Sequence, residues 1–323
     1  MRLLVVELRR LVARKVVWLT LLGAVAVSLV SVAGIFSQAR QIDAARAGGD
    51  SDYQRMVEES EFQQEECLRM QDQDRRQSGD ASIDYGCADW QVPTIEEFYG
   101  QLPSLAEQLG YALQGMAYPV MFLALAMGST AVAAEFAHRT MGTWLTFVPR
   151  RTPVFVSKLL APALAALPMT LVGLAVVWLG VTLVYRIFEL DTALGADGWS
   201  STLWMAVRIA GLAMVAGAFG AAAAFLVRHT GVVLGLMIGY LVLVEGMIGS
   251  MFGWVPRYGL ARNIGAWVQD GTSWSTYTDC QRMEGCREVT QTLSLTHGAV
   301  VIGVVLVVVT VAAWFRFRTA DVD

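Results

Sequence analysis

Six runs of apolar residues recur along the chain, and polar segments of very different length separate them. The runs cover residues 16–36, 111–134, 159–187, 203–227, 231–252 and 297–315. Charge is almost absent from them, and each is close to or longer than the ~18–20 residues that a helix needs to cross a bilayer. The pattern predicts an all-α integral membrane protein with six transmembrane helices.

The polar segments are expected to contain shorter helices. These segments are 1–15, 37–110, 135–158, 188–202, 253–296 and 316–323, with a short turn at 228–230. An apolar stripe beside a basic face predicts that 1–15 is a helix lying in the membrane interface. We also predict a helix over Tyr53–Gln77 and a short helix that begins with a capping box at Thr94–Glu97. A further helix is predicted over Leu260–Val268, where clustered aromatic residues suit the outer membrane surface.

Composition narrows the possible functions. Only 16% of the residues are charged, against about 25% in a soluble domain. Neither of the two lysines, Lys15 and Lys158, lies in the G-x-x-x-x-G-K-[ST] loop of ATPases. The net charge is −4 and no basic face carries interleaved aromatic residues, which argues against a nucleic-acid partner. The histidines fall in separate segments without catalytic spacing, so we expect no enzyme activity, metal or cofactor on this chain.

The distribution of charge predicts the orientation of the chain. With the N-terminus in the cytoplasm, segments 1–15, 135–158, 228–230 and 316–323 face inward and contain twelve basic and four acidic residues. The rest of the chain contains twelve basic and twenty-four acidic residues. Lys and Arg near membrane ends stay on the cytoplasmic side, so both termini are predicted to be cytoplasmic, as an even number of spans also requires. The acidic segment 37–110 is then extracellular.

All four cysteines fall in the two long segments predicted to face outward. Cys67 and Cys87 lie in 37–110, and Cys280 and Cys286 lie in 253–296. An even number of cysteines confined to one side suits disulfides in an oxidising compartment. Three pairings are possible, and we favour Cys67–Cys87 with Cys280–Cys286 because each closes a short loop. A metal site is less favoured because the ligand spacings are wrong.

Segment 135–158 is more structured than a simple connection between two spans requires. The residues that we expect to take part in docking there are Glu135, His138, Arg139, Gly142, Thr143, Pro149, Arg150 and Arg151. Glu135 and Arg139 are spaced to share one helix face, Gly142 allows a tight turn, and a second amphipathic turn ends at Pro149. This arrangement predicts a docking element for a soluble cytoplasmic partner.

The order of these motifs resembles that of the membrane subunits of type-2 ATP-binding-cassette (ABC) exporters. The pattern E-x-x-x-[RK]-x-x-G-T at 135–143, followed by a proline, two arginines and Lys158, is similar to the loop after the second span in that family. Residues 7–18 are similar to its interfacial connecting helix, and 256–271 to its outer re-entrant segment. The resemblance covers nearly all of the chain except 37–110, which is similar to inserts of actinobacterial members that carry a cysteine pair.

The resemblance implies a type-2 exporter fold and a function. Segment 135–158 would contain the coupling helix that fits a groove on a separate ABC ATPase subunit. Two membrane subunits, identical or paralogous, and two ATPase subunits would form the working exporter in the bacterial plasma membrane, and ATP and Mg would bind the ATPase. The cargo would be an amphipathic drug or antibiotic, peptide or lipid. Importer subunits place a glycine six residues after the glutamate, whereas Gly142 lies seven after Glu135, so the importer reading is weaker.

Two charged residues lie well inside the predicted spans, Arg208 in 203–227 and Glu245 in 231–252. A charge in hydrocarbon costs roughly 2.5–3.5 kcal/mol unless it is paired or hydrated. The matching depths of the two residues favour an intramembrane ion pair. The alternative is that Glu245 faces the export path and contacts a cationic substrate.

Gly231, Gly235 and Gly239 recur every four residues in the fifth span. This glycine ridge allows another helix to approach closely. By resemblance, spans one and five flank the interface of the dimer, although packing within one subunit explains the ridge equally well.

Two other functional classes fit parts of the sequence. A secondary transporter driven by an ion gradient would be expected to contain inverted repeats and broken helices, and we find no convincing repeat. A peptide-sensing or immunity membrane protein could use the acidic segment 37–110 to capture a cationic peptide.

Overall fold

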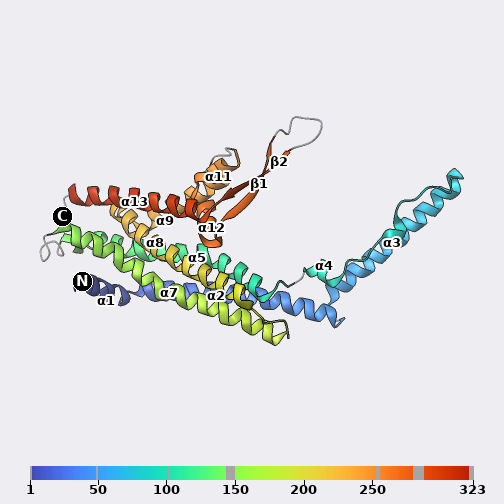
Figure 1. Ribbon diagram of the computed structural model, residues 1–323, viewed down its shortest axis with the longest axis horizontal. Helices are drawn as coiled ribbons and strands as arrows, with labels where there is room; N and C mark the ends of the chain where they lie inside the picture. Colours follow the sequence, from blue (N-terminus) through green and yellow to red (C-terminus); the bar gives the residue numbers. More distant parts are fainter. Residues whose placement is uncertain are drawn as a thin grey trace.

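The computed structural model describes residues 2–48, 50–100, 102–142, 150–251, 255–278 and 287–319. Within these residues, six helices are long and apolar enough to cross a membrane, as predicted. Both chain ends lie at one end of the helix bundle, and a long helical arm projects from the opposite end (Figure 1).

The bundle consists of an N-terminal helix and the six spanning elements. They are α1 (Arg2–Val12), α2 (Lys15–Arg46), α5 (Leu105–Ala137), α7 (Arg151–Ile187), α8 (Gly195–Val227), α9 (Thr230–Gly239) continued by the π-helical segment η2 (Tyr240–Ile248), and α13 (Leu295–Thr319). The helices begin and end away from the predicted span limits. The third span already starts at Arg151 and the first continues to Arg46, because hydropathy locates the apolar part of a helix rather than its ends.

The core of the bundle lies between α5, α7 and α8, and close contact between α5 and α8 depends on glycine. A Cβ on Gly128 of α5 would collide with the carbonyl of Gly217 in α8. A Cβ on Gly220 would likewise collide with the carbonyl of Leu125. Small residues let two helix backbones approach this closely. In contrast, α9 and α13 are largely exposed on the outside of the bundle.

The arm consists of α3 (Ser51–Ser78), a return segment containing η1 (Cys87–Asp89), and α4 (Ile95–Tyr99). The Asp50 carboxylate begins α3 by accepting hydrogen bonds from the Tyr53 and Asp52 amides. The Tyr53 amide is the main cause of the lowered pKa of Asp50. Gly79, at φ 70°, ends the helix, as only glycine does readily. The predicted capping box is present, with the Thr94 and Glu97 side chains each accepting from the other's backbone amide.

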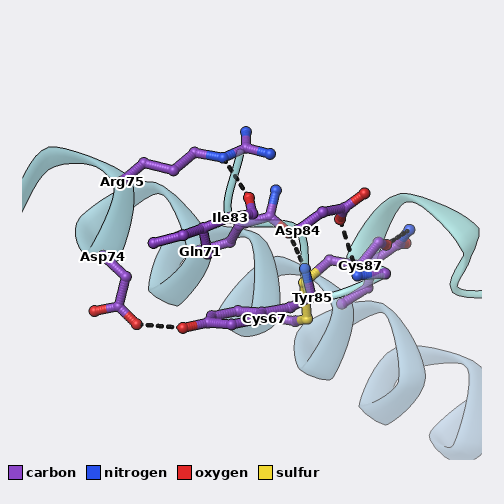
Figure 2. The surroundings of a disulfide bond; sticks show 10 residues. Cys67, Gln71, Asp74, Arg75, Ile83, Asp84, Tyr85 and Cys87 are labelled. Atoms are coloured by element: carbon purple, nitrogen blue, oxygen red, sulfur yellow. Dashed lines mark hydrogen bonds between the residues drawn. A yellow bond between two sulfur atoms is a disulfide. The ribbon is translucent and has the colours of Figure 1, made fainter. Parts of the chain in front are cut away.

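The predicted disulfide between Cys67 and Cys87 fastens the return segment to α3 (Figure 2). The two Cα atoms are 5.7 Å apart. The Gln71 side chain accepts a hydrogen bond from the Tyr85 amide at 2.8 Å, and the Tyr85 hydroxyl donates to Asp74 at 2.6 Å. This hydrogen bond to a carboxylate raises the pKa of Tyr85. The arm is therefore held at several points along its outer half. Cys280 and Cys286 lie outside the described residues.

The fifth span ends with the short helix α10 (Gly249–Met251). The second long segment then contains α11 (Val255–Tyr258), α12 (Leu260–Gln269) and an antiparallel hairpin of β1 (Thr272–Thr278) and β2 (Arg287–Leu293). Helix α12 confirms the short helix predicted at 260–268. The hairpin, which pairs Thr272 with Leu293 and Thr278 with Arg287, was not predicted. It is an exception to the all-α fold.

Candidate functional site

Charged residues are buried at the end of the bundle that holds both chain ends. Glu7 of α1, Glu135 of α5 and Lys158 of α7 are only 7%, 2% and 3% exposed. Together with Arg10 and Arg14 they form a network that we call the ion cluster. Charges are rarely buried unless they are paired, so the partners of each residue matter.

Lys158 bridges two carboxylates from different helices. Its Nζ lies 3.1 Å from Oε1 of Glu7 and 2.5 Å from Oε2 of Glu135. An isolated ammonium group would be very costly at this depth, and the two carboxylates offset that cost. The contact therefore ties α1, α5 and α7 together at one point.

Arg14, in the turn between α1 and α2, binds the other side of the Glu135 carboxylate. Its Nη2 lies 3.0 Å from Oε1 of Glu135, and its Nη1 donates to the carbonyl oxygen of Ala131 at 2.8 Å. Nη1 of Arg10 lies 3.8 Å from the same carboxylate oxygen. The cluster thus contains three cations and two carboxylates.

The ion cluster resists movement of α1 relative to the ends of α5 and α7. Such movement would separate a buried carboxylate from a buried cation, and removing one partner of a buried pair typically costs about 3–5 kcal/mol. Displacement of either helix end would therefore carry α1 with it. The arrangement can therefore transmit a mechanical displacement between these helices.

An aromatic cluster lies beside the ion cluster at the same end of the bundle. Phe155 of α7, Phe225 of α8 and Phe317 of α13 pack against one another, with ring centroids 4.9–6.1 Å apart. Arg151 donates to the carbonyls of Phe317 and Arg318 at 2.8 and 2.9 Å. A cation at a helix C-terminus is stabilising, so Arg151 joins the start of α7 to the end of α13.

The residues predicted to dock a partner divide into two groups. Glu135 and Arg151 point into the protein, where they hold helix ends together, whereas His138, Arg139 and Arg150 are exposed. We call these three residues the exposed tip. Gly142 lies in a short helical turn beyond α5, and Thr143 and Pro149 lie outside the described residues.

One expectation about this segment was wrong. Glu135 and Arg139 do not share a helix face, because α5 ends at Ala137 and Arg139 adopts a left-handed backbone conformation with φ 53°. The chain turns at this point, so Glu135 faces the bundle interior and Arg139 faces solvent. Glu135 pairs instead with Arg14 and Lys158, which are distant in sequence.

The predicted intramembrane pair of Arg208 and Glu245 does not form among the described residues. Arg208 pairs with Asp270 at 3.1 Å and donates to the carbonyl of Val268. Glu245 instead accepts a hydrogen bond from the amide of Ala261 at 2.7 Å. Both residues hold α12, from opposite ends of that helix, because α12 folds back between the spans that carry them.

The glycine ridge of α9 faces away from the other helices of the described chain. A Cβ on Gly235 or Gly239 would meet no atom within 4 Å, and one on Gly231 would meet only its neighbour His229. Among the described residues, no other helix therefore packs on the ridge.

The described residues contain no group of three or more potential metal-binding side chains. The chain is a polytopic helical membrane protein whose amphipathic first helix is joined to its second and third spans. It belongs to the ABC-2 transporter family, since the family model described as "ABC-2 family transporter protein" matches residues 1–322. Neither a curated protein nor a solved structure matches significantly.

Family membership confirms the resemblance read from the sequence. It makes the chain a multi-pass membrane subunit of an ABC transporter, which works with an ABC ATPase subunit. The ion cluster was missed at the sequence level. Lys158 could have indicated a buried charge, because it is one of only two lysines and lies directly before an apolar run.

Proposed function

We propose that this chain is the membrane subunit of an ATP-driven exporter that moves an amphipathic drug or antibiotic, peptide or lipid out of a bacterial cell. Two copies of a separate ATPase bind ATP and Mg, and two membrane subunits, identical or paralogous, form the passage. Both termini are cytoplasmic, and segment 135–158 is the contact with the ATPase.

The ion cluster is the main support for the proposal that movement of the ATPase is coupled to movement of the helices. The exposed tip of His138, Arg139 and Arg150 is available to a soluble partner. Directly behind it, Glu135 is bound to Arg14 and Lys158. A displacement imposed on the tip by nucleotide-driven closure of the ATPases therefore reaches α1, α5 and α7 at once.

The glycine ridge supports a dimer of membrane subunits. Gly231, Gly235 and Gly239 present backbone without side chains toward open space, and helices associate closely at such surfaces in membranes. A second membrane subunit packed on α9 would cover this ridge.

The coupling role is tested by replacing Glu135 with alanine in the assembled exporter. The Glu135→Ala variant is expected to assemble with the ATPase but to lose stimulation of ATP hydrolysis by the membrane subunit, because the tip is no longer tied to α1 and α7. Glu58→Ala, an exposed acidic residue on α3, is the matched control and retains stimulation. Wild-type stimulation by Glu135→Ala would remove the coupling assignment.

A second preparation, which lacks the ATPase, separates this proposal from a secondary transporter. Proteoliposomes that contain the membrane subunit without an ATPase are expected to show no ion-driven efflux. Vigorous efflux from them would favour the secondary transporter.

A further inference from the structure

Glu245 is an acidic residue inside the fifth span, and its surroundings leave half of its carboxylate without a partner. Oε2 accepts the hydrogen bond from the Ala261 amide, whereas Oε1 is buried and makes no hydrogen bond among the described residues. Buried polar atoms are nearly always hydrogen-bonded, so an unpartnered one requires an explanation. The free-energy cost of leaving a polar atom without a partner is especially large for a charged carboxylate inside the membrane.

No cation of the described chain lies within ion-pair distance of this carboxylate. Arg208 is bound to Asp270, and Arg262 lies over the ring of Trp274, with its guanidinium carbon 4.9 Å from the ring centroid. The nearby hydroxyl groups are neutral. The Tyr240 hydroxyl accepts from the Leu260 amide and also interacts with the Glu245 carboxyl group, and the Tyr118 hydroxyl donates to the Ala261 carbonyl. The described residues therefore supply no cation to this carboxyl group.

The local backbone directs Glu245 to this position. Residues 240–248 form the π-helical segment η2, and π-helical turns often occur at functional sites. Tyr240 and Glu245 both contact the first turn of α12 from this segment. A side chain on Gly259 would overlap the Glu245 carboxyl group, which explains why a glycine precedes α12.

An apolar groove lies beside Tyr240 and Leu260, the residues next to Glu245. A cavity of ≈ 360 Å³ lies between α8, α9, α12 and α13, and its lining includes Phe219, Leu236, Met237, Tyr240, Leu260 and Val305. Tyr240 and Leu260 are joined by the hydrogen bond beside Glu245. The groove therefore has apolar walls, and two of its lining residues border the Glu245 carboxyl group, which itself does not line it.

We propose that Glu245 and this groove form a binding site for an amphipathic cation. The apolar body of the ligand lies along α9 and α13, and its cationic group pairs with Glu245. Charge complementarity carries this choice, because a cation would supply the missing partner of Oε1, whereas a neutral lipid chain would leave it unpaired. The inference deepens the proposed export function by naming a class of cargo and rests on it for that role, but binding itself requires no ATPase.

The test measures binding to the full chain in nanodiscs, without ATPase or nucleotide, so that failure of coupling cannot affect the result. The probes are tetraphenylphosphonium and tetraphenylborate, which have similar shape and opposite charge. Binding above that of empty nanodiscs is compared for wild type, Glu245→Gln, Leu236→Trp and Glu288→Gln. Glu288 is an exposed acidic residue on β2 and serves as the control.

Wild type and Glu288→Gln are expected to bind tetraphenylphosphonium but not tetraphenylborate. Glu245→Gln should weaken cation binding at least about tenfold, the loss expected when a charged partner is removed. Leu236→Trp, which fills the exposed side of the groove, should weaken it as well and tests the site even where Glu245→Gln does not fold. Equal cation binding by wild type and Glu245→Gln, or by wild type and Leu236→Trp, would overturn the proposal. Equal binding of the two probes, as expected for a neutral lipid groove, would also overturn it.

Discussion

At the scale of single residues, Lys158 shows how one buried charge organises an end of the protein. Its side chain is 2% exposed and contacts carboxylates of α1 and α5. Without the lysine, Glu7 and Glu135 would face each other in a nearly water-free position. The arginines of the cluster are more exposed than Lys158 and contact Glu135 from the other side, so they compensate only in part.

The first prediction concerns this lysine. Lys158→Met should lower the stability of the detergent-solubilised protein by about 3–5 kcal/mol, the usual cost of removing one partner of a buried ion pair. Thermal unfolding followed by circular dichroism measures the effect. Lys15→Met, which changes the other, exposed lysine, should leave the unfolding temperature nearly unchanged. Equal effects of the two substitutions would contradict the account of the cluster.

The partners of Glu135 could not have been predicted from the sequence. Its spacing suggested that it shares a helix face with Arg139, four residues later. Helix α5 ends between the two, and Arg14, 121 residues away, takes that position. Pairing across helices depends on tertiary packing, which a single sequence does not specify. Arg208 and Glu245 were predicted to pair with each other, but both contact α12 instead.

At the scale of elements, the spans and the arm were predicted because their signals are local. Length and lack of charge identified the six spans. In the arm, a composition rich in Glu, Gln and Arg identified the long helix, and the capping box at Thr94–Glu97 identified the short one. The hairpin of β1 and β2 was missed although Thr, Trp, Tyr and Val favour strands. Its aromatic residues were interpreted as a membrane-interface pattern instead.

The second prediction tests the close contact of α5 and α8. Gly128→Ala should destabilise the protein by about 1–3 kcal/mol, as overpacking generally does, because its methyl group has to displace the backbone of α8. Gly235→Ala, where a methyl group meets open space, is the matched control in chemical denaturation. A larger loss for Gly235→Ala would show that the two glycines have been assigned the wrong roles.

The third prediction concerns the arm. Replacing Cys67 and Cys87 with serine should remove about 3 kcal/mol of stabilisation from the return segment, as expected for a closed loop of this length. Chymotrypsin should then cleave after Tyr85 faster than in the wild type, as seen by mass spectrometry of the fragments. Helix α3 should persist, because Asp50 and Gly79 still cap it. Unchanged cleavage would mean that the hydrogen bonds of Gln71 and Asp74 hold the segment alone.

At the scale of the whole molecule, the two ends of the bundle have different chemistry. One end holds the ion cluster, the aromatic cluster and the exposed tip, together with both chain ends (Figure 1). The other end carries the disulfide-fastened arm. This polarity agrees with an exporter whose energy is supplied at one membrane face and whose cargo leaves at the other.

The fourth prediction concerns which end of the bundle faces the cytoplasm. A membrane-impermeant reagent that reacts with arginine should modify positions on the arm, such as Arg69, in intact cells. It should reach Arg150 only after the membrane is opened, because the positive-inside distribution predicts that this residue is cytoplasmic. Peptide mapping reports both sites in one sample. Modification of Arg150 from outside the cell would reverse the topology.

Photo-crosslinking tests most directly whether the exposed tip contacts an ATPase. p-Benzoylphenylalanine is introduced at Arg139 in the tip or, as the control, at Tyr85 on the arm, and cells are irradiated before purification. The account predicts that Arg139→p-benzoylphenylalanine captures a nucleotide-hydrolysing ABC subunit and that Tyr85→p-benzoylphenylalanine does not. Capture of that subunit from the arm, with none from the tip, would contradict it.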